Sequence, residues 1–191
     1  MTNNESAISV ALLRELITAN FATGDLLWNV RRADHFADSW SRPSEHVCNN
    51  WNARYGGTKA LSSADKFGHL CGRINARLIY AHRAIWALAN GAWPTNFIDH
   101  INGIPGDNRV VNLRDVPHKD NLRNARLSMA NSTGCTGVYF VPRRSKWTAR
   151  ITVDGVEKSF GYHDTYEKAV AARHAAAARF GFHPNHGRSA L

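Results

Sequence analysis

One stretch of this chain, residues 97–127, limits the possible fold more than any other. The apolar run Phe97–His100 stops just before Asn102-Gly103, a strong turn dipeptide, and Arg109–Leu113 alternates like a returning strand. Residues 119–127 contain neither Gly nor Pro and predict a helix. Its buried stripe would be formed by Leu122, Ala125 and Ala130. The stretch therefore predicts a unit of strand, loop, strand and helix.

An acid, an imidazole and two amides recur at intervals within this unit. Asp99 and His100 end the first predicted strand, Asn112 lies in the second, and Asn121 falls in the first turn of the helix. A hard divalent cation, Mg²⁺ or Mn²⁺, prefers oxygen ligands, which Asp99 and the amide of Asn121 could supply beside a phosphate. His100 would then accept a proton from the attacking water, and Asn112 could pin the loop with its amide.

These residues resemble the HNH, or ββα-metal, nuclease motif in the form found in phage and intron-encoded homing endonucleases. The resemblance covers residues 81–124 and includes His82-Arg83-Ala84-Ile85-Trp86 and Trp93-Pro94 upstream of the motif. It implies that His100 is the general base and Asp99 a metal ligand. It also implies that Asn112 organises the loop and that Asn121 is the second metal ligand, since this branch carries Asn where others carry His.

Other residues near the motif have less specific interpretations. His118 is a rival to Asn121 for the third position of the motif, which supplies the second metal ligand. Because His118 precedes the helix, it is interpreted, with Arg123, as a candidate phosphate contact. His82 and Trp86 lie one helical turn apart and are interpreted as packing residues rather than metal ligands. The alternative for the motif itself is a structural coincidence without catalytic function, because Asn-Gly turns and Asn helix caps are common.

A second unit begins after Ser132-Thr133-Gly134. Three strands are predicted, at residues 137–140, 146–153 and 156–162, joined by a turn at 142–145 and by the Asp154-Gly155 hairpin turn. Thr165 could cap a helix from Tyr166 to Phe180, in which small alanines would allow close packing on the sheet. The predicted fold class is therefore α+β: a central ββα-metal unit followed by a three-stranded antiparallel sheet packed on one helix.

Residues 133–181 resemble the Apetala/ethylene-response-factor DNA-binding domain. The shared elements are Gly-Val, Lys-Trp-x-Ala-x-Ile, Gly-Tyr-x-Asp-Thr and the Ala-rich helix. In that family the sheet lies in the major groove of DNA. The corresponding DNA contacts here would be Arg143, Arg144, Lys146, Trp147, Arg150 and Lys158. Tyr139, Arg150 and Ser159 depart from the plant pattern, so no target sequence can be inferred. The alternative is that Trp147 is a core residue and that the basic residues only solvate the sheet.

The charge of the chain favours a polyanionic partner. The sequence has 24 Lys and Arg against 15 Asp and Glu, a net charge of +9. Between Lys119 and Arg150 there are seven basic residues, Arg126 among them, and one acid. Such a concentration of one sign fits a connector lying along a phosphate backbone. Double-stranded DNA is therefore the predicted partner.

The N-terminal residues carry weaker signals. Ile8–Asn20 predicts an amphipathic helix, Asp25–Val30 a strand, Leu70–Ile74 and Arg77–Tyr80 a hairpin, and Ala81–Asn90 a helix. Residues 31–58 are polar and rich in turn formers, and they read as a long loop that either contacts DNA or is an ordinary insertion. The predicted domains are residues 1–68, an α+β scaffold, residues 69–131, the nuclease unit, and residues 132–191, the DNA-binding unit.

The remaining features bear on the compartment. Cys48, Cys71 and Cys135 are odd in number and far apart, so neither a disulfide framework nor a structural zinc site is expected. No apolar run has the length of a membrane span, and the first residues lack the pattern of a signal peptide. The prediction is a metal-dependent, site-specific DNA endonuclease in the cytoplasm of a bacterium or a phage-infected cell. The alternatives are a DNA-binding regulator with a vestigial nuclease unit and an RNA-directed nuclease.

Overall fold

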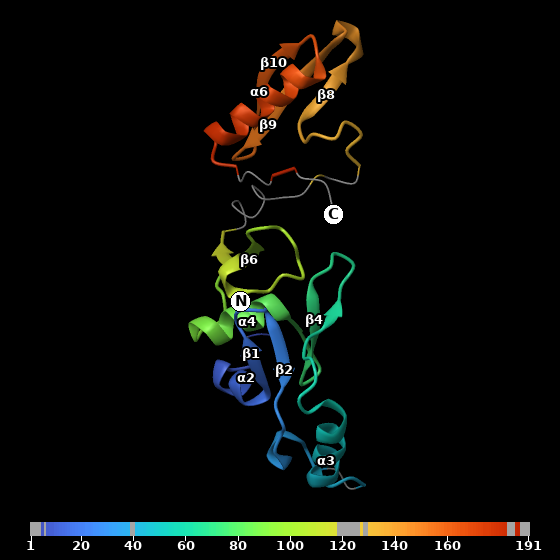
Figure 1. The fold of residues 1–191 in the computed structure, drawn as a ribbon, viewed down its shortest axis with the longest axis vertical. Helices are drawn as coiled ribbons and strands as arrows, with labels where there is room; N and C mark the ends of the chain where they lie inside the picture. The colour runs from blue at the N-terminus through green and yellow to red at the C-terminus, as the bar shows by residue number, and fades with distance from the viewer. Residues whose placement is uncertain are drawn as a thin grey trace. The chain divides into compact units, whose positions relative to one another are not determined.

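The computed structural model contains two compact units, residues 1–115 and 116–191 (Figure 1). It describes residues 5, 7–38, 41–117, 127, 130–182 and 186–187. Helices and short antiparallel sheets occur in both units, in agreement with the predicted α+β class. None of the helices within those described ranges is long and apolar enough to cross a membrane.

The first unit begins with a helix and a two-stranded hairpin. Helix α2 spans Val10–Leu16, and the side chain of Ser9 caps it by accepting a hydrogen bond from the Leu12 amide. Strands β1 (Ile17–Asn20) and β2 (Asp25–Trp28) pair antiparallel. The prediction of one helix to Asn20 was wrong, because the β-branched pair at the start of β1 joins the hairpin instead. The predicted strand near Asp25 is confirmed.

The polar segment 31–58 is not one long loop. It contains a 3₁₀ turn, η1 (Ala33–His35), and a helix, α3 (Ser44–Tyr55). Only Cys48 of α3 is buried, and Val47, Trp51 and Asn52 are half-buried, so the face that the helix packs against the unit is narrow. The loop prediction therefore failed at a helix with a small packed face.

A second small sheet carries the chain to the central helix. Strand β3 (Ser63–Ala64) pairs with β4 (Leu70–Ile74), which forms a hairpin with β5 (Arg77–Tyr80). The hairpin turn places Asn75 and Ala76 at φ values of 48° and 62°, as a tight turn with left-handed residues requires. Helix α4 (Ala81–Asn90) follows directly and ends at Gly91 in the left-handed conformation. The predicted hairpin and helix are both confirmed.

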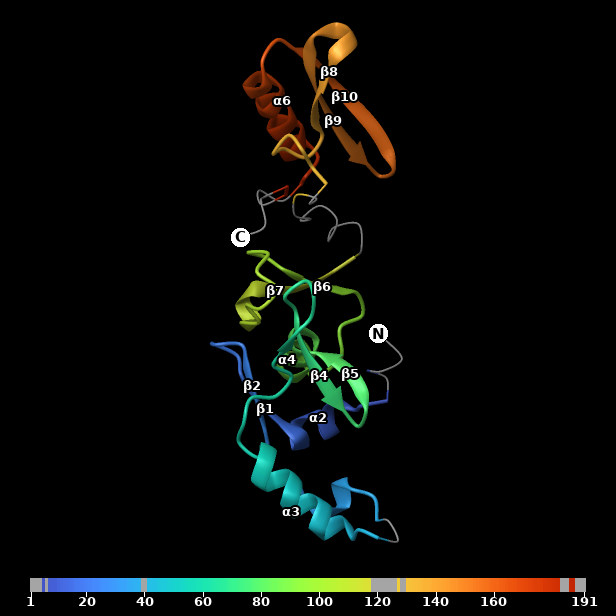
Figure 2. The same ribbon diagram turned by 90° about the vertical axis from the view of Figure 1, so that its right-hand side faces the viewer.

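Helix α4 is the centre of the first unit, and both views show it between the β1–β2 hairpin and β6 (Figures 1 and 2). Its Ala84, Ile85 and Ala87 are fully buried against a core that runs from Ile8 to Leu113. The buried Arg83 on the same helix forms an ion pair with Glu5 and donates to the carbonyls of Pro94 and Asn96. One core thus contains residues from both of the domains predicted at 1–68 and 69–131.

The strands of the predicted nuclease unit follow α4. Strand β6 (Phe97–His100) pairs with β7 (Leu113–Val116). The first strand is confirmed, but the second was predicted at Arg109–Leu113, where the structure has the 3₁₀ turn η2 (Val110–Asn112). Alternating polarity misled the prediction, because Val110 packs on the core while Val111 is exposed at the outside of this turn.

The turn of the β1–β2 hairpin supports the loop between β6 and β7. Gly24 has φ of 78°, and a Cβ at this position would lie 2.5 Å from the backbone carbon of Asn108. The Val110 amide also donates to the carbonyl of Phe21 in the same turn. A glycine is required here both by its φ and by this close approach. The predicted helix at 119–127 lies outside the described residues except for Leu127.

The second unit is a three-stranded antiparallel sheet with one helix. Strands β8 (Val138–Val141), β9 (Lys146–Val153) and β10 (Val156–His163) have the order β10-β9-β8, and the 3₁₀ turn η3 (Pro142–Arg144) joins the first two. Helix α6 (Tyr166–Arg179) is capped by Thr165, as predicted. Ile151 and Val153 of β9 share a core with Ala176 of α6. The predicted architecture of the second unit, a three-stranded antiparallel sheet packed on one helix, is confirmed.

Candidate active site

Strand β6 places a carboxylate and an imidazole next to each other inside the first unit. Asp99 is 7% exposed and His100 is 5% exposed, although both side chains are polar. The strand pairs with β7, and the Ile101 amide just beyond it donates to the carbonyl of Asn112. Buried polar groups on a strand must be satisfied by neighbouring side chains, so their partners define the site.

Arg114 on β7 is the partner of Asp99. Its Nε and Nη2 donate to Oδ2 of Asp99 at 2.8 and 2.6 Å. A guanidinium that holds one carboxylate oxygen fixes the orientation of the whole group. Sequence reasoning did not assign Arg114 a role. The pairing of two strands around the loop could have suggested it, had the second strand been placed at Leu113–Val116.

Asn108 in the intervening loop contacts His100. The distance between Nε2 of His100 and Oδ1 of Asn108 is 3.1 Å, and both residues are buried. With the amide oxygen as acceptor, Nε2 carries the proton and the lone pair of a neutral imidazole is on Nδ1. Burial lowers the pKa of His100 below its usual value, whereas the hydrogen bond with Asn108 acts in the opposite direction. The imidazole is therefore held in the neutral form that a base requires.

Asn112 closes the loop that begins after His100. Its Oδ1 accepts from the Asn102 amide at 2.9 Å, and its Nδ2 donates to Oδ1 of Asn102 and to the carbonyl of Asp107. Asp107 in turn accepts from Asn102 and from Arg109. This geometry is that of a residue that organises a loop, since one amide satisfies three groups on two residues of the segment.

Two further histidines lie beside His100. The ring centroid of His82 on α4 is 5.2 Å from that of His100, and His69, which precedes β4, is 5.9 Å away. His69 also lies 5.5 Å from His82 and 3.5 Å from Oδ2 of Asp65 through its Nδ1. His69 lies outside the motif, and nothing in the local sequence pointed to it.

His82 was interpreted as a packing residue, and the structure places it in the core at 8% exposure. Burial lowers the pKa of His82 well below its usual value, and the nearby His100 acts in the same direction. Its Nδ1 is buried and has no hydrogen-bond partner among the residues that the structure describes. His82 is therefore a neutral ring that packs on His100, and its position beside the site is more specific than the sequence indicated.

The donors for a divalent cation are only partly described. Asp99 supplies a carboxylate, but the amide of Asn121 lies outside the described residues, as do His118, Arg123 and Arg126. Within the described ranges, no group of three or more His, Cys, Asp or Glu residues could hold a metal ion. The buried Asp99 carboxylate, oriented by Arg114, is a hard oxygen donor of the kind that divalent cations prefer.

In the second unit, the candidate DNA contacts are divided between two faces of the sheet. Trp147 faces α6, since its ring lies 5.0 Å from that of Tyr166, and Lys158 lies over the ring of Phe180 at the end of α6. Side chains alternate along a strand, so Lys146 and Arg150 project from the opposite face, called here the open face.

The open face combines guanidinium groups with tyrosine rings. Arg150 lies 5.3 Å from the ring of Tyr139 and forms an ion pair with Glu157 at 2.7 Å. Arg144 in η3 lies 4.5 Å from the ring of Tyr162. The remaining candidates are close by: Lys146 pairs with Asp164 at 2.9 Å, and Arg143 is exposed in η3.

Comparison with known proteins identifies the central motif. A family model described as HNH endonuclease matches residues 79–123, which include α4, β6 and β7. Protein 3.8 of Escherichia phage T7 is 32% identical over 87 residues, which cover 45% of this chain and 72% of that protein. No solved structure matches. The chain therefore belongs to the same family as Protein 3.8 of Escherichia phage T7, and it contains an HNH endonuclease domain at residues 79–123.

Proposed function

We propose that this chain is a site-specific DNA endonuclease of the homing type that uses one divalent cation and His100 as general base. An HNH domain implies DNA as the substrate, and such nucleases generally use a divalent metal ion. The observation that carries the proposal is the buried pair Asp99 and His100, held by Arg114 and Asn108 within the matched region.

The residues support a simple division of roles. His100, neutral and hydrogen-bonded through Nε2, takes the proton from the water that attacks phosphorus, and the bond from phosphorus to the leaving oxygen breaks. Asp99 and Asn121 would hold the cation, and Arg114 orients the Asp99 carboxylate. When bound, the cation supplies Lewis-acid stabilisation of the phosphate. Asn112 keeps the loop closed so that Asn108 keeps its hydrogen bond with His100.

The second unit is proposed to select the DNA site, as its resemblance to the Apetala/ethylene-response-factor domain implies. The open face offers Arg144 and Arg150 beside tyrosine rings, which suits phosphate and base contacts. Action in the cytoplasm of a bacterium or a phage-infected cell is part of the same proposal. One active site cuts one strand, so a monomer is expected to nick.

Supercoiled plasmid incubated with Mg²⁺ or Mn²⁺ tests the proposal. Conversion to open-circle or linear DNA that stops when EDTA is added is the expected result. Retardation of the plasmid in a gel without cleavage, in either metal, would instead indicate a DNA-binding protein with a vestigial nuclease unit. Preferential cleavage of double-stranded RNA would indicate an RNA-directed enzyme.

A further inference from the structure

A pocket of about 510 Å³ lies in the first unit away from the motif residues. It is bounded by η1, α3 and the turn of the β4–β5 hairpin. The residues that line it include Arg31, His35, Trp51, Tyr55, Arg73 and Asn75. None of the described residues lining it is acidic. A pocket with two arginines and no carboxylate is suited to an anion.

Arg31 is a buried cation that has no counter-ion and no side-chain hydrogen bond within the described part of the chain. It is 9% exposed, and its guanidinium makes no hydrogen bond or ion pair with any described residue. Nε is fully buried without an acceptor, and burial lowers the pKa of Arg31. A buried charge that lacks both a counter-ion and hydrogen bonds is costly to the fold, and the aromatic rings around the guanidinium offset only part of that cost. An anion bound in the pocket would offset more of it.

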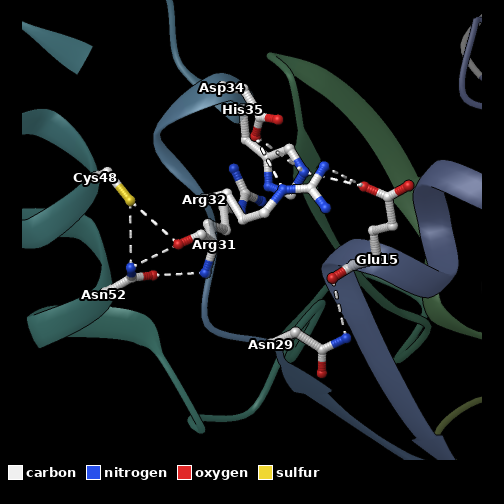
Figure 3. A network of polar contacts seen from close by, with 8 residues as sticks. All are labelled: Glu15, Asn29, Arg31, Arg32, Asp34, His35, Cys48 and Asn52. Carbon is white, nitrogen blue, oxygen red and sulfur yellow. Dashed lines mark hydrogen bonds and ion pairs between the residues drawn. The ribbon is translucent and has the colours of Figure 1, made fainter. Parts of the chain in front are cut away.

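The position of Arg31 is fixed by its backbone and by aromatic rings. Its amide donates to Oδ1 of Asn52 at 2.8 Å, and its carbonyl accepts from Nδ2 of Asn52 and Sγ of Cys48, both on α3 (Figure 3). The guanidinium lies 4.0 Å from the ring of Trp51 and 5.1 Å from that of Trp28. The donor group is therefore held in one place before any ligand arrives.

A second buried nitrogen at the same pocket also lacks a partner. Nε2 of His35 lies 3.1 Å from Oε2 of Glu15. Figure 3 draws this contact as a dashed line. Nδ1 of His35 is buried and makes no hydrogen bond within the described ranges. Arg73 borders the pocket from the hairpin, where Nη1 donates to the carbonyl of Ala76. Its other nitrogens could reach a ligand, since the residue is exposed. Three residues with nitrogen-bearing side chains, Arg31, His35 and Arg73, thus line one pocket.

We propose that this pocket binds a backbone phosphate of the DNA substrate through Arg31 and Arg73, with the neighbouring sugar or base against Tyr55. A phosphate accepts several hydrogen bonds from guanidinium groups, and a partly exposed ring beside it provides a stacking surface. Tyr55 is 36% exposed and its ring lies 5.3 Å from that of Trp51. The site would anchor DNA at a point distinct from the cleaved bond.

The proposal requires DNA as the substrate but does not require cleavage by His100. Binding is therefore measured in EDTA, with the full chain and a short fluorescein-labelled duplex of arbitrary sequence, over a series of salt concentrations. Arg73→Gln is the test variant because the residue is exposed and its loss leaves the core intact. Arg77→Gln is the matched control, an exposed arginine of the same hairpin outside the pocket.

Arg73→Gln is expected to weaken binding several-fold and to make the slope of log K against log salt shallower by about one unit, the signature of one lost phosphate contact. Arg77→Gln is expected to leave the slope unchanged. Arg31→Lys, which keeps the charge, is expected to lose affinity with its thermal unfolding transition retained. Equal slopes for the two hairpin variants would overturn the proposal.

A second part of the experiment distinguishes a DNA phosphate from a free anion as the ligand of the pocket. Inorganic phosphate and pyrophosphate are added as competitors at constant ionic strength. Weak competition, needing millimolar concentrations, is expected because a single anion lacks the stacking contact. Tight binding of pyrophosphate together with an unchanged DNA slope in Arg73→Gln would contradict the proposal and indicate a small-anion site instead.

Discussion

Arg114 donates two hydrogen bonds to the same carboxylate oxygen of Asp99, at 2.8 and 2.6 Å. The pair joins β6 to β7 at the point where the HNH domain is proposed to bind its cation. A carboxylate restrained in this way loses little conformational freedom when it binds a ligand. Arg114 is therefore expected to act as a positioning residue for Asp99.

Arg114→Gln is expected to raise the Mg²⁺ concentration needed for half-maximal cleavage about tenfold, since second contacts to metal ligands typically contribute 10- to 100-fold. The maximal rate at saturating Mg²⁺ should fall less. Metal titration of plasmid cleavage measures both quantities. Arg77→Gln serves as the exposed control, and an unchanged metal dependence in Arg114→Gln would show that Asp99 needs no such support.

His69 is expected to contribute to cleavage although it lies outside the matched domain. Its ring is 5.9 Å from that of His100, its side chain is one-third exposed, and Asp65 orients it. His69→Ala should lower the cleavage rate by about 10- to 100-fold, the lower range for a group that assists proton transfer or holds a phosphate. His46→Ala, an exposed histidine on α3, is the control. Equal rates for the two variants would assign His69 a packing role.

The two faces of the C-terminal sheet are expected to differ in DNA binding. Arg150→Gln removes a cation from the open face, whereas Lys158→Gln removes one beside Phe180 on the helix face. Affinity should fall by about 1 to 3 kcal/mol for Arg150→Gln if the residue reads a base, and by clearly less for Lys158→Gln. Anisotropy titrations on a cleavage-site duplex measure both. A larger loss for Lys158→Gln would place DNA on the other face.

Much of the fold follows from local pattern. The β4–β5 hairpin, α4, β6 and the whole C-terminal sheet with α6 lie where turn dipeptides and side-chain periodicity predict them. The errors occur where burial does not follow the periodicity of apolar residues in the sequence. Only Cys48 of α3 is buried. The sequence of η2 resembles a strand because Val110 packs on the core while Val111 is exposed. Tertiary contacts determine the conformation of these segments, and such contacts cannot be read from the local sequence pattern.

The candidate site was predictable in its motif but not in its surroundings. The spacing of Asp99, His100 and Asn112 predicts that they lie at one loop, where the structure places them, and their roles stay predictions. Arg114 depended on strand register, and His69 depended on a separate sheet that packs near α4. Contacts of this kind join segments far apart in sequence, for which spacing gives no signal.

The loop between the strands is expected to lose stability in acid. Hydrogen bonds from Arg109 hold the pKa of Asp107 at about 2, below its usual 3.8. Because the folded state has the lower pKa, this contribution is fully present above about pH 4 and is lost as pH falls from 3.8 towards 2. Thermal unfolding across this range should show a decline in wild type that Asp107→Asn lacks. Parallel declines in the two proteins would contradict the assignment.

The most direct test of the account is the rate of plasmid cleavage by His100→Ala, measured together with DNA binding in EDTA. The account predicts a loss of cleavage of about 10²- to 10⁴-fold with binding within a few-fold of wild type, because a general base acts on the reaction and not on affinity. His174→Ala, an exposed histidine on α6, should cleave like wild type. Cleavage near the wild-type rate by His100→Ala would contradict the central claim.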